Sequence, residues 1–142
     1  MELLNEKSNL IMGKLTSGMN FLGAHKKINN STVFTPLSIE AVDQVKIGER
    51  DALIYSLSHY GEQNGDLMAD PEMLFAKIEF IEGHTHWIPY YYKNDYMGVE
   101  QVSIYFEKNQ ISVEMQKDHK NFADTWMVNI TEQQGIVGME ME

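Results

Sequence analysis

Residues 52–81 read ALIYSLSHYGEQNGDLMADPEMLFAKIEFI, and this stretch decides the fold. Apolar and polar side chains alternate along Ala52–His59, which predicts a strand with two unlike faces. Met73–Ile81 alternates in the same way and predicts a second strand. The pair Asn64-Gly65 between them is a strong turn signal. We therefore predict a hairpin whose two strands are joined by a long polar loop over residues 60–72.

Downstream of this hairpin the sequence predicts further strands and then a helix. The strands are expected at His86–Tyr92, Val99–Phe106 and Gln110–Met115. From Lys117 onward, apolar residues recur at spacings of three and four, as on one side of a helix. This helix is expected to lay Trp126 on the sheet and to end near Gly135.

Upstream, Glu2–Met12 has the pattern of an amphipathic helix, and residues 25–31 read as a polar connection. Val33–Val42 alternates like a strand, although Thr35-Pro36 would also suit the start of a helix. We expect the strand. The fold class predicted is α+β, an antiparallel meander of about five to six strands with an N-terminal and a C-terminal helix packed on it. We expect one domain over residues 1–142, with a helical segment over about 1–30 and a frayed acidic tail over about 136–142.

Charge and composition restrict the function classes. The 142 residues carry 21 acidic and 11 basic side chains, a formal net charge of −10, and Arg50 is the one arginine. Nucleic-acid sites need a basic surface, so direct nucleic-acid binding is not expected. The chain has no cysteine, no apolar run long enough for a membrane helix and no secretory signal pattern. These features predict a cytoplasmic domain without membrane contact, and they leave its oligomeric state open.

The loop between the first two strands concentrates polar side chains of ligand-binding type: Glu62, Asp66, Asp70 and Glu72. Carboxylates of this kind bind Mg²⁺ or Ca²⁺, but their spacing does not fit an EF-hand. Asn64-Gly65 and Asp70-Pro71 also explain the stretch as turn architecture, which is the interpretation we favour.

A second candidate metal site is the pair His84 and His86, two residues apart on an extended segment. Combined with Asp66 and Asp70, and with His59, these histidines would give a metal-dependent hydrolase. The signal is weak because a His-x-His without cysteines is usually exposed. Ser58 and His59 cannot form a catalytic pair, because neighbours on a strand point to opposite faces. We predict neither a metal nor another cofactor.

Three consecutive motifs, SLSHY (56–60), QNGDLM (63–68) and DPEMLF (70–75), resemble a family of small uncharacterised proteins encoded by bacteria, their phages and conjugative elements. The resemblance spans roughly residues 34–135. It implies no activity and no catalytic residues, but it implies an accessory protein of mobile DNA.

The sequence therefore predicts a non-enzymatic accessory or binding protein that acts on a host or element-encoded protein, or on a small ligand. The alternative is the metal-dependent hydrolase described above. The residues expected to contact the partner or ligand are His59, Glu62, Asn64, Asp66, Asp70, Glu72, Tyr91, Asn94 and Asp95.

Overall fold

The structure is a computed structural model that describes residues 1–81 and 83–136. Its elements, in chain order, are α1 (Glu6–Leu15), β1 (His25–Ile28), β2 (Leu37–Ile47), β3 (Arg50–Gln63), β4 (Asp66–Ile81), β5 (His84–Asn94), β6 (Val99–Val102), β7 (Ile104–Tyr105), the 3-10 helix η1 (Phe106–Lys108), β8 (Gln110–Ile111) and α2 (Val113–Gln133). The acidic tail, predicted to be frayed, lies outside the described residues except for Ile136.

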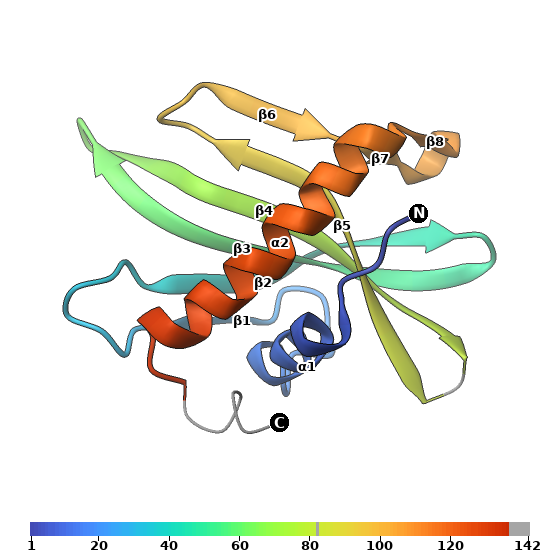
Figure 1. The fold of residues 1–142 in the computed structure, drawn as a ribbon, viewed down its shortest axis with the longest axis horizontal. Coiled ribbons are helices and arrows are strands. Elements are labelled where there is room, and N and C mark those ends of the chain that lie inside the picture. The colour runs from blue at the N-terminus through green and yellow to red at the C-terminus, as the bar shows by residue number, and fades with distance from the viewer. Residues whose placement is uncertain (82, 137–142) are drawn as a thin grey trace.

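β1 to β6 form one antiparallel sheet in which each strand pairs with the next along the chain (Figure 1). The predicted α+β meander with a helix at each end is therefore confirmed. β3 and β4 lie in the middle of the sheet, and their alternation sends Tyr55, Leu57, Met73 and Phe75 into the core. These four side chains are fully buried, so the hairpin at residues 52–81 does organise the fold.

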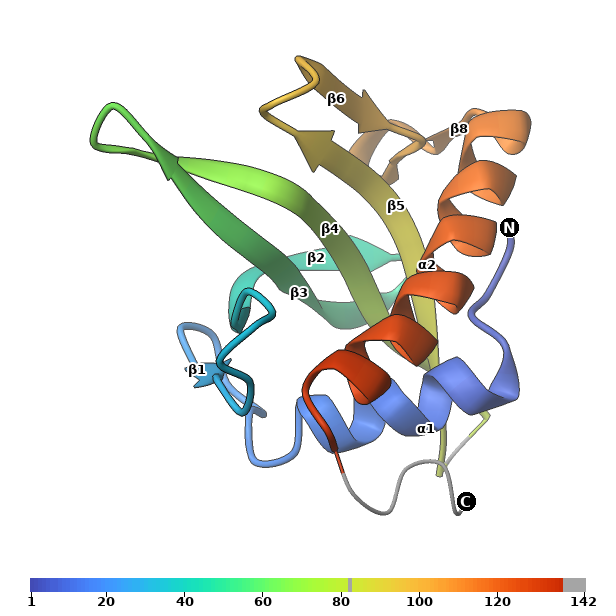
Figure 2. The same ribbon diagram turned by 60° about the vertical axis from the view of Figure 1, so that its left-hand side comes forward.

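Both helices pack on the same face of the sheet (Figure 2). Ile11 of α1 and Trp126 of α2 belong to one core cluster with Trp87 of β5. The predicted apolar stripe of α2 is Phe122, Ala123, Trp126, Met127 and Ile130. The last four are buried, whereas Phe122 is 41% exposed. Burial of large apolar side chains such as Trp87 and Trp126 stabilises the domain. We call this side of the sheet the helix face.

The opposite side of the sheet is apolar only at one end. There, Ile54, Ile78 and Ile88 pack with Ile104 of β7 in a second buried cluster. β2 shifts register after Ala41, and its far end brings partly buried apolar side chains against this cluster. The rest of this side carries polar side chains, and we call it the polar face.

Several boundaries differ from those predicted. α1 begins at Glu6 because Asn5 caps it, accepting the backbone N–H of Ser8 with its side-chain oxygen. β2 begins at Leu37, four residues later than expected, and continues to Ile47. Residues His25–Ile28, expected to be a connection, form β1 by pairing with the start of β2.

The predicted strand over Gln110–Met115 was wrong in most of its length. Only Gln110–Ile111 are extended, and they pair with Ile104–Tyr105 in a separate two-stranded ribbon. α2 then begins at Val113, earlier than expected from the position of Lys117. Ser112 is its N-cap residue, and its backbone N–H donates to the carbonyl of Ser103. The helix thus extends into a segment that alternation had assigned to a strand.

Neither helix within the described parts of the chain combines the length and hydrophobicity needed to cross a membrane. This agrees with the absence of a long apolar run in the sequence.

Candidate functional site

The stretch expected to be a long loop is a two-stranded arm. β3 and β4 continue through it and are joined by a turn of two residues, Asn64 and Gly65, whose φ angles are +53° and +84°. Positive φ at both central residues is what a tight hairpin turn requires. Figure 2 shows this hairpin projecting from the rest of the sheet. The prediction of a polar loop over residues 60–72 was therefore wrong, and the polar side chains lie on strands.

The arm, defined as residues 60–71, extends past the neighbouring strands. The last pair between β2 and β3 joins Leu37 to His59. The last pair between β4 and β5 joins Glu72 to Lys93. Beyond these pairs the two strands of the arm have only each other as partners in the sheet.

The turn after β5 supports the arm at its base. The backbone N–H of Ala69 donates to Oδ2 of Asp95 at 2.7 Å, and the backbone N–H of Asp95 donates to the carbonyl of Ala69 at 2.9 Å. Nearby, the phenol of Tyr96 lies against Gly61, where a Cβ would stand 2.2 Å from the phenol oxygen. Glycine at position 61 therefore permits this close approach.

Three of the predicted site residues are brought together at this base. Asn94 is buried, and its side-chain amide donates to Oδ1 of Asp70 at 2.9 Å. Asp95 caps Ala69 as described and lies 3.5 Å from the ammonium of Lys93. Asp70, Asn94 and Asp95 thus hold the arm on the turn after β5.

Three others lie at or near the exposed end of the arm. Glu62, Asn64 and Asp66 are all exposed. Residues 51–76 contain no lysine or arginine, so these carboxylates have no cationic neighbour of either type along this part of the hairpin. The end of the arm is consequently an acidic projection into solvent.

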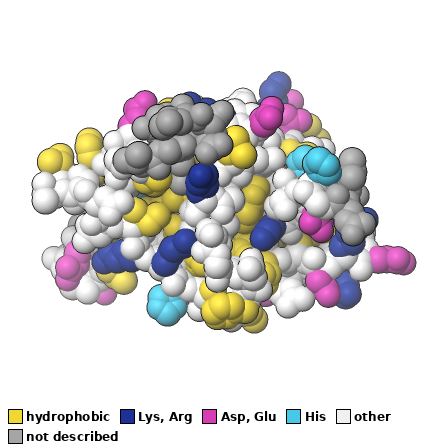
Figure 3. Space-filling model, turned by 90° about the horizontal axis from the view of Figure 1, so that it is seen from below, with side chains coloured by type: hydrophobic (Ala, Val, Ile, Leu, Met, Phe, Trp, Pro, Cys, Tyr) yellow, Lys and Arg dark blue, Asp and Glu magenta, His cyan; other side chains and the backbone are white. Residues whose placement is uncertain are grey.

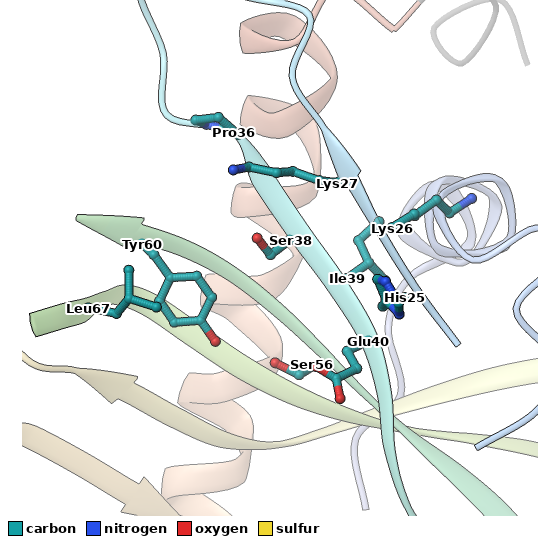
Figure 4. Close-up of a pocket in the computed structure, with 10 residues that line it drawn as sticks. All are labelled: His25, Lys26, Lys27, Pro36, Ser38, Ile39, Glu40, Ser56, Tyr60 and Leu67. Carbon is teal, nitrogen blue, oxygen red and sulfur yellow. The ribbon is translucent and has the colours of Figure 1, made fainter. Parts of the chain in front are cut away.

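A pocket of about 440 Å³ opens on the polar face where the arm leaves the sheet. Figure 4 shows Tyr60 and Leu67 of the arm on one side, Lys27 of β1 on the other, and Ser38 and Ser56 between them. The remaining lining residues are His25, Lys26, Pro36, Ile39 and Glu40. The lining combines apolar side chains with hydroxyl groups and charges of both signs.

Hydrogen bonds order the floor of this pocket. The buried hydroxyl of Ser56 donates to Oε2 of Glu72 at 2.6 Å. Burial raises the pKa of Tyr60, and the charges of Glu72 and Glu40 act in the same direction, while a hydrogen bond with Ser58 opposes them. Tyr60 therefore stays a neutral phenol at physiological pH and can donate or accept a hydrogen bond.

Glu72, which accepts the hydrogen bond of the pocket residue Ser56, is also a predicted site residue, whereas the remaining two, His59 and Tyr91, lie away from the pocket. His59 is buried on the helix face, with its ring 5.6 Å from that of Trp126. Its Nδ1 lies 3.1 Å from the carbonyl oxygen of Pro36, and its buried Nε2 has no partner among the described residues. Tyr91 donates to Oε2 of Glu100 at 2.5 Å, and its pKa is raised by burial and then by this carboxylate. His59 and the pocket are thus on opposite faces.

The residues of the hydrolase alternative do not converge. His84 pairs with Ile81 at one end of β4, whereas Asp66 begins β4 at the other end. Across residues 1–81 and 83–136, no three side chains of His, Asp or Glu are grouped as metal ligands. A metal-assisted hydrolase needs such a group in one cavity.

A buried serine–histidine pair was not anticipated from the sequence. Oγ of Ser103 lies 2.8 Å from Nδ1 of His119, and Oε1 of Gln101 lies 3.2 Å from Nε2. Ser103 is only 1% exposed and His119 only 3%. A substrate cannot reach this hydroxyl, so the pair joins α2 to the end of the sheet and is structural.

Most of the residues that line the pocket were also not predicted from the sequence. The alternation of Ile54, Ser56 and Ser58 did predict that these serines share a face. The far wall, however, comes from β1, which the sequence alone assigned to a connection.

The charges are distributed unevenly over the surface. Figure 3, which looks up from the side of α1, shows Lys and Arg side chains among hydrophobic ones, with acidic groups toward the margins. Exposed apolar side chains near α1 include Leu10, Phe21 and Leu22. The acidic arm lies at a different part of the molecule (Figures 1 and 2).

The chain belongs to the family described as "Domain of unknown function (DUF6908)", which it matches over residues 6–136. A comparison with curated proteins found no match, and a comparison with solved structures found none either. The match covers both helices, the sheet, the arm and the pocket.

Proposed function

We propose that this domain is a non-enzymatic binding protein that recognises a partner protein through its arm and the adjoining polar face. The observation that carries the proposal is the arm itself. It projects beyond the sheet, is held in place at its base by Asp95, and presents Glu62, Asn64 and Asp66 to solvent. Rigidly supported, exposed polar segments are where binding residues usually lie.

The arrangement of titratable groups supports binding over catalysis. An active site needs acids, bases or nucleophiles within hydrogen-bond reach of one substrate position. The pocket offers serine hydroxyls, one phenol and separated charges, and the buried Ser103–His119 pair is closed to solvent. A surface of this kind suits recognition of polar groups.

We further propose that the protein is a cytoplasmic accessory protein of a phage or another mobile element, acting on a host protein. The support is the resemblance of the three motifs over residues 56–75 to proteins of such elements. Its test is the genomic neighbourhood of the family members. Integrase, relaxase or phage genes beside a large share of them are expected, and their absence would contradict this setting.

The partner is tested by native co-purification followed by mass spectrometry. Wild type is compared with a double variant, Glu62→Gln with Asp66→Asn, which removes two charges near the arm end. The matched control is Glu79→Gln with Glu49→Gln, which removes two exposed charges elsewhere on the molecule. We expect a protein that wild type and control retain and that the arm variant loses. Equal recovery by all three contradicts the proposal.

The metal content gives an independent test. We expect protein purified without a histidine tag to contain no stoichiometric zinc or manganese on elemental analysis. One metal ion per chain would instead contradict the proposal and support the hydrolase.

A further inference from the structure

The two edges of the arm are treated differently by the rest of the chain. On the β4 side, Asp95 satisfies both backbone groups of Ala69, as an additional strand would. On the β3 side, β2 stops at Leu37, and Pro36 precedes it. Among the described residues, no main-chain hydrogen bond joins residues 60–63 to anything outside the hairpin. One edge is therefore capped and the other is open.

The register shows which groups the open edge presents. The residues that flank a two-residue turn, here Gln63 and Asp66, face each other as a hydrogen-bonded pair. In an antiparallel ladder the next pair, Glu62 with Leu67, directs its N–H and C=O groups outward. Two pairs further along, Tyr60 and Ala69 also direct their N–H and C=O groups outward, and Asp95 binds those of Ala69. Glu62 and Tyr60 thus present backbone donors and acceptors at the β3 edge.

The open edge adjoins the pocket. Tyr60 borders both, and Leu67, which is 72% exposed, lies across the arm from Glu62. A strand added beside Tyr60–Gln63, on the edge with which β2 no longer pairs, would send alternate side chains over the polar face. Addition of a strand to an exposed sheet edge is a known mode of peptide recognition.

We propose that an extended, basic segment of the partner protein adds to the β3 edge of the arm at Tyr60–Gln63 as a further strand. This inference rests on the proposed function and names the partner's chemistry. Backbone hydrogen bonds to Tyr60 and Glu62 supply the pairing, and a lysine or arginine of the segment lies over the carboxylate of Glu62.

The negative charge of the arm favours a basic segment of a partner over a second copy of this chain as the added strand. Pairing of two β3 edges would bring together two arms, each with the carboxylates of Glu62, Asp66 and Asp70 and no cation between residues 51 and 76. Like charges facing each other across an edge oppose such pairing. Lys27 on the far wall of the pocket repels a basic side chain from β1, so we expect the lysine or arginine of the segment at Glu62.

The test uses the full-length, isotope-labelled protein and synthetic octapeptides. The basic peptide alternates lysine and threonine. A second peptide has the same sequence with every amide N-methylated, which keeps the charge and removes the backbone donors. A third replaces lysine by glutamate. With saturating basic peptide, we expect amide exchange at Tyr60 and Glu62 to slow by about tenfold or more, with Leu67 unchanged. The other two peptides should give no protection.

Two variants make the result specific to the edge. Glu62→Pro removes an outward N–H that the hairpin does not use, and proline is tolerated at such edge positions. Glu62→Gln separates charge from backbone, and Glu79→Gln, which removes an exposed charge away from the arm, is the control. Peptide binding should be lost in Glu62→Pro, weakened in Glu62→Gln and retained in Glu79→Gln. Melting curves verify that each variant folds. If a variant does not fold, the comparison of the three peptides on the wild-type protein still tests the proposal.

Equal binding of the plain and the N-methylated basic peptide would overturn strand addition and leave the binding function intact. Protection by the acidic peptide would overturn the assignment of a basic segment. Failure of wild type to bind the basic peptide would overturn the inference as a whole. The proposed function fails separately, when the co-purification experiment shows no partner that depends on the arm.

Discussion

His119 is enclosed between the start of α2 and the last strands of the sheet. Its ring stacks on Tyr92 and makes close contacts with Ser103 and Gln101. Burial lowers the pKa of His119 below its ordinary value of 6.5, and the nearby charge of Asp118 only partly opposes this. The folded protein therefore favours the neutral form of the His119 imidazole.

This environment predicts a loss of stability in mild acid. As the pH falls below about 6.5, the unfolded chain protonates His119 before the folded chain does, so the free energy of unfolding decreases with falling pH. His119→Gln removes the titration and keeps an amide for Ser103 and Gln101. We expect the melting-temperature advantage of wild type over His119→Gln to be smaller at pH 5.5 than at pH 8. The exposed His84→Gln is the control, and an equal effect there would contradict the assignment.

Gly65 tests the turn that ends the arm. Its φ of +84° is costly for residues with a Cβ, although a Cβ there would meet no atom within 4 Å. Gly65→Val should therefore lower the free energy of unfolding by roughly 1 kcal/mol or more through backbone strain alone. Gly65→Asn should cost less, because asparagine tolerates positive φ. Urea denaturation measures both, and equal costs would contradict this account.

At the scale of elements, alternation predicted the core of the sheet well. Segments 52–59 and 73–81 have an apolar face because one side of each strand packs on the helices. The arm between them contains glycine, proline and acidic residues, a local composition that predicts a loop. Its strands persist because Asp95 and Tyr96, some 30 residues away in the chain, support them. Such long-range support leaves no local signal.

β1 and the start of α2 were missed for related reasons. β1 is a four-residue edge strand containing two lysines, a composition that protects an edge but does not mark a strand. The first turn of α2 follows an alternating segment, and Ser112 ends the short ribbon and begins the helix. Pairing with β2 made residues 25–28 a strand instead of a connection, and the N-cap at Ser112 made the following residues a helix instead of a strand.

The docking of α2 was predicted correctly and can be tested at Trp126. This side chain is 6% exposed and contacts the rings of His59 and Phe122. Trp126→Ala should cost about 3–5 kcal/mol, a large part of the roughly 5–15 kcal/mol that stabilises an ordinary domain. Phe122→Ala should cost much less, because Phe122 is 41% exposed. Comparable melting temperatures for the two variants would mean that α2 is not docked through Trp126.

At the scale of the whole molecule, the candidate site depends on elements that the sequence does not place together. The sequence identified the acidic stretch and the shared face of Ser56 and Ser58. It did not place β1 across from Tyr60, because that depends on the order of strands in the finished sheet. Of the predicted residues, Asp70, Asn94 and Asp95 form the arm base, Glu62, Asn64 and Asp66 are exposed toward the arm end, and His59, Glu72 and Tyr91 lie outside both groups.

This division predicts different effects for two neighbouring aspartates. Asp66 is exposed near the tip, whereas Asp70 accepts a hydrogen bond from the buried amide of Asn94. Asp66→Asn should leave the melting temperature unchanged. Asp70→Asn keeps an acceptor for Asn94 and should cost less than about 1 kcal/mol, while Asp70→Ala leaves that amide unpaired and should cost about 1–3 kcal/mol.

Partner binding should follow the opposite order. Removing the charge of Asp66 weakens the attraction of the arm for a basic segment, so Asp66→Asn should reduce retention of the co-purifying partner, most clearly at low salt. Asp70→Asn should retain it, because the carboxylate of Asp70 is already engaged within the arm base. Melting and co-purification of the two variants, each measured at low and high salt, separate the roles. Loss of partner in Asp70→Asn with full retention in Asp66→Asn would place the binding charge at the base of the arm instead of its end.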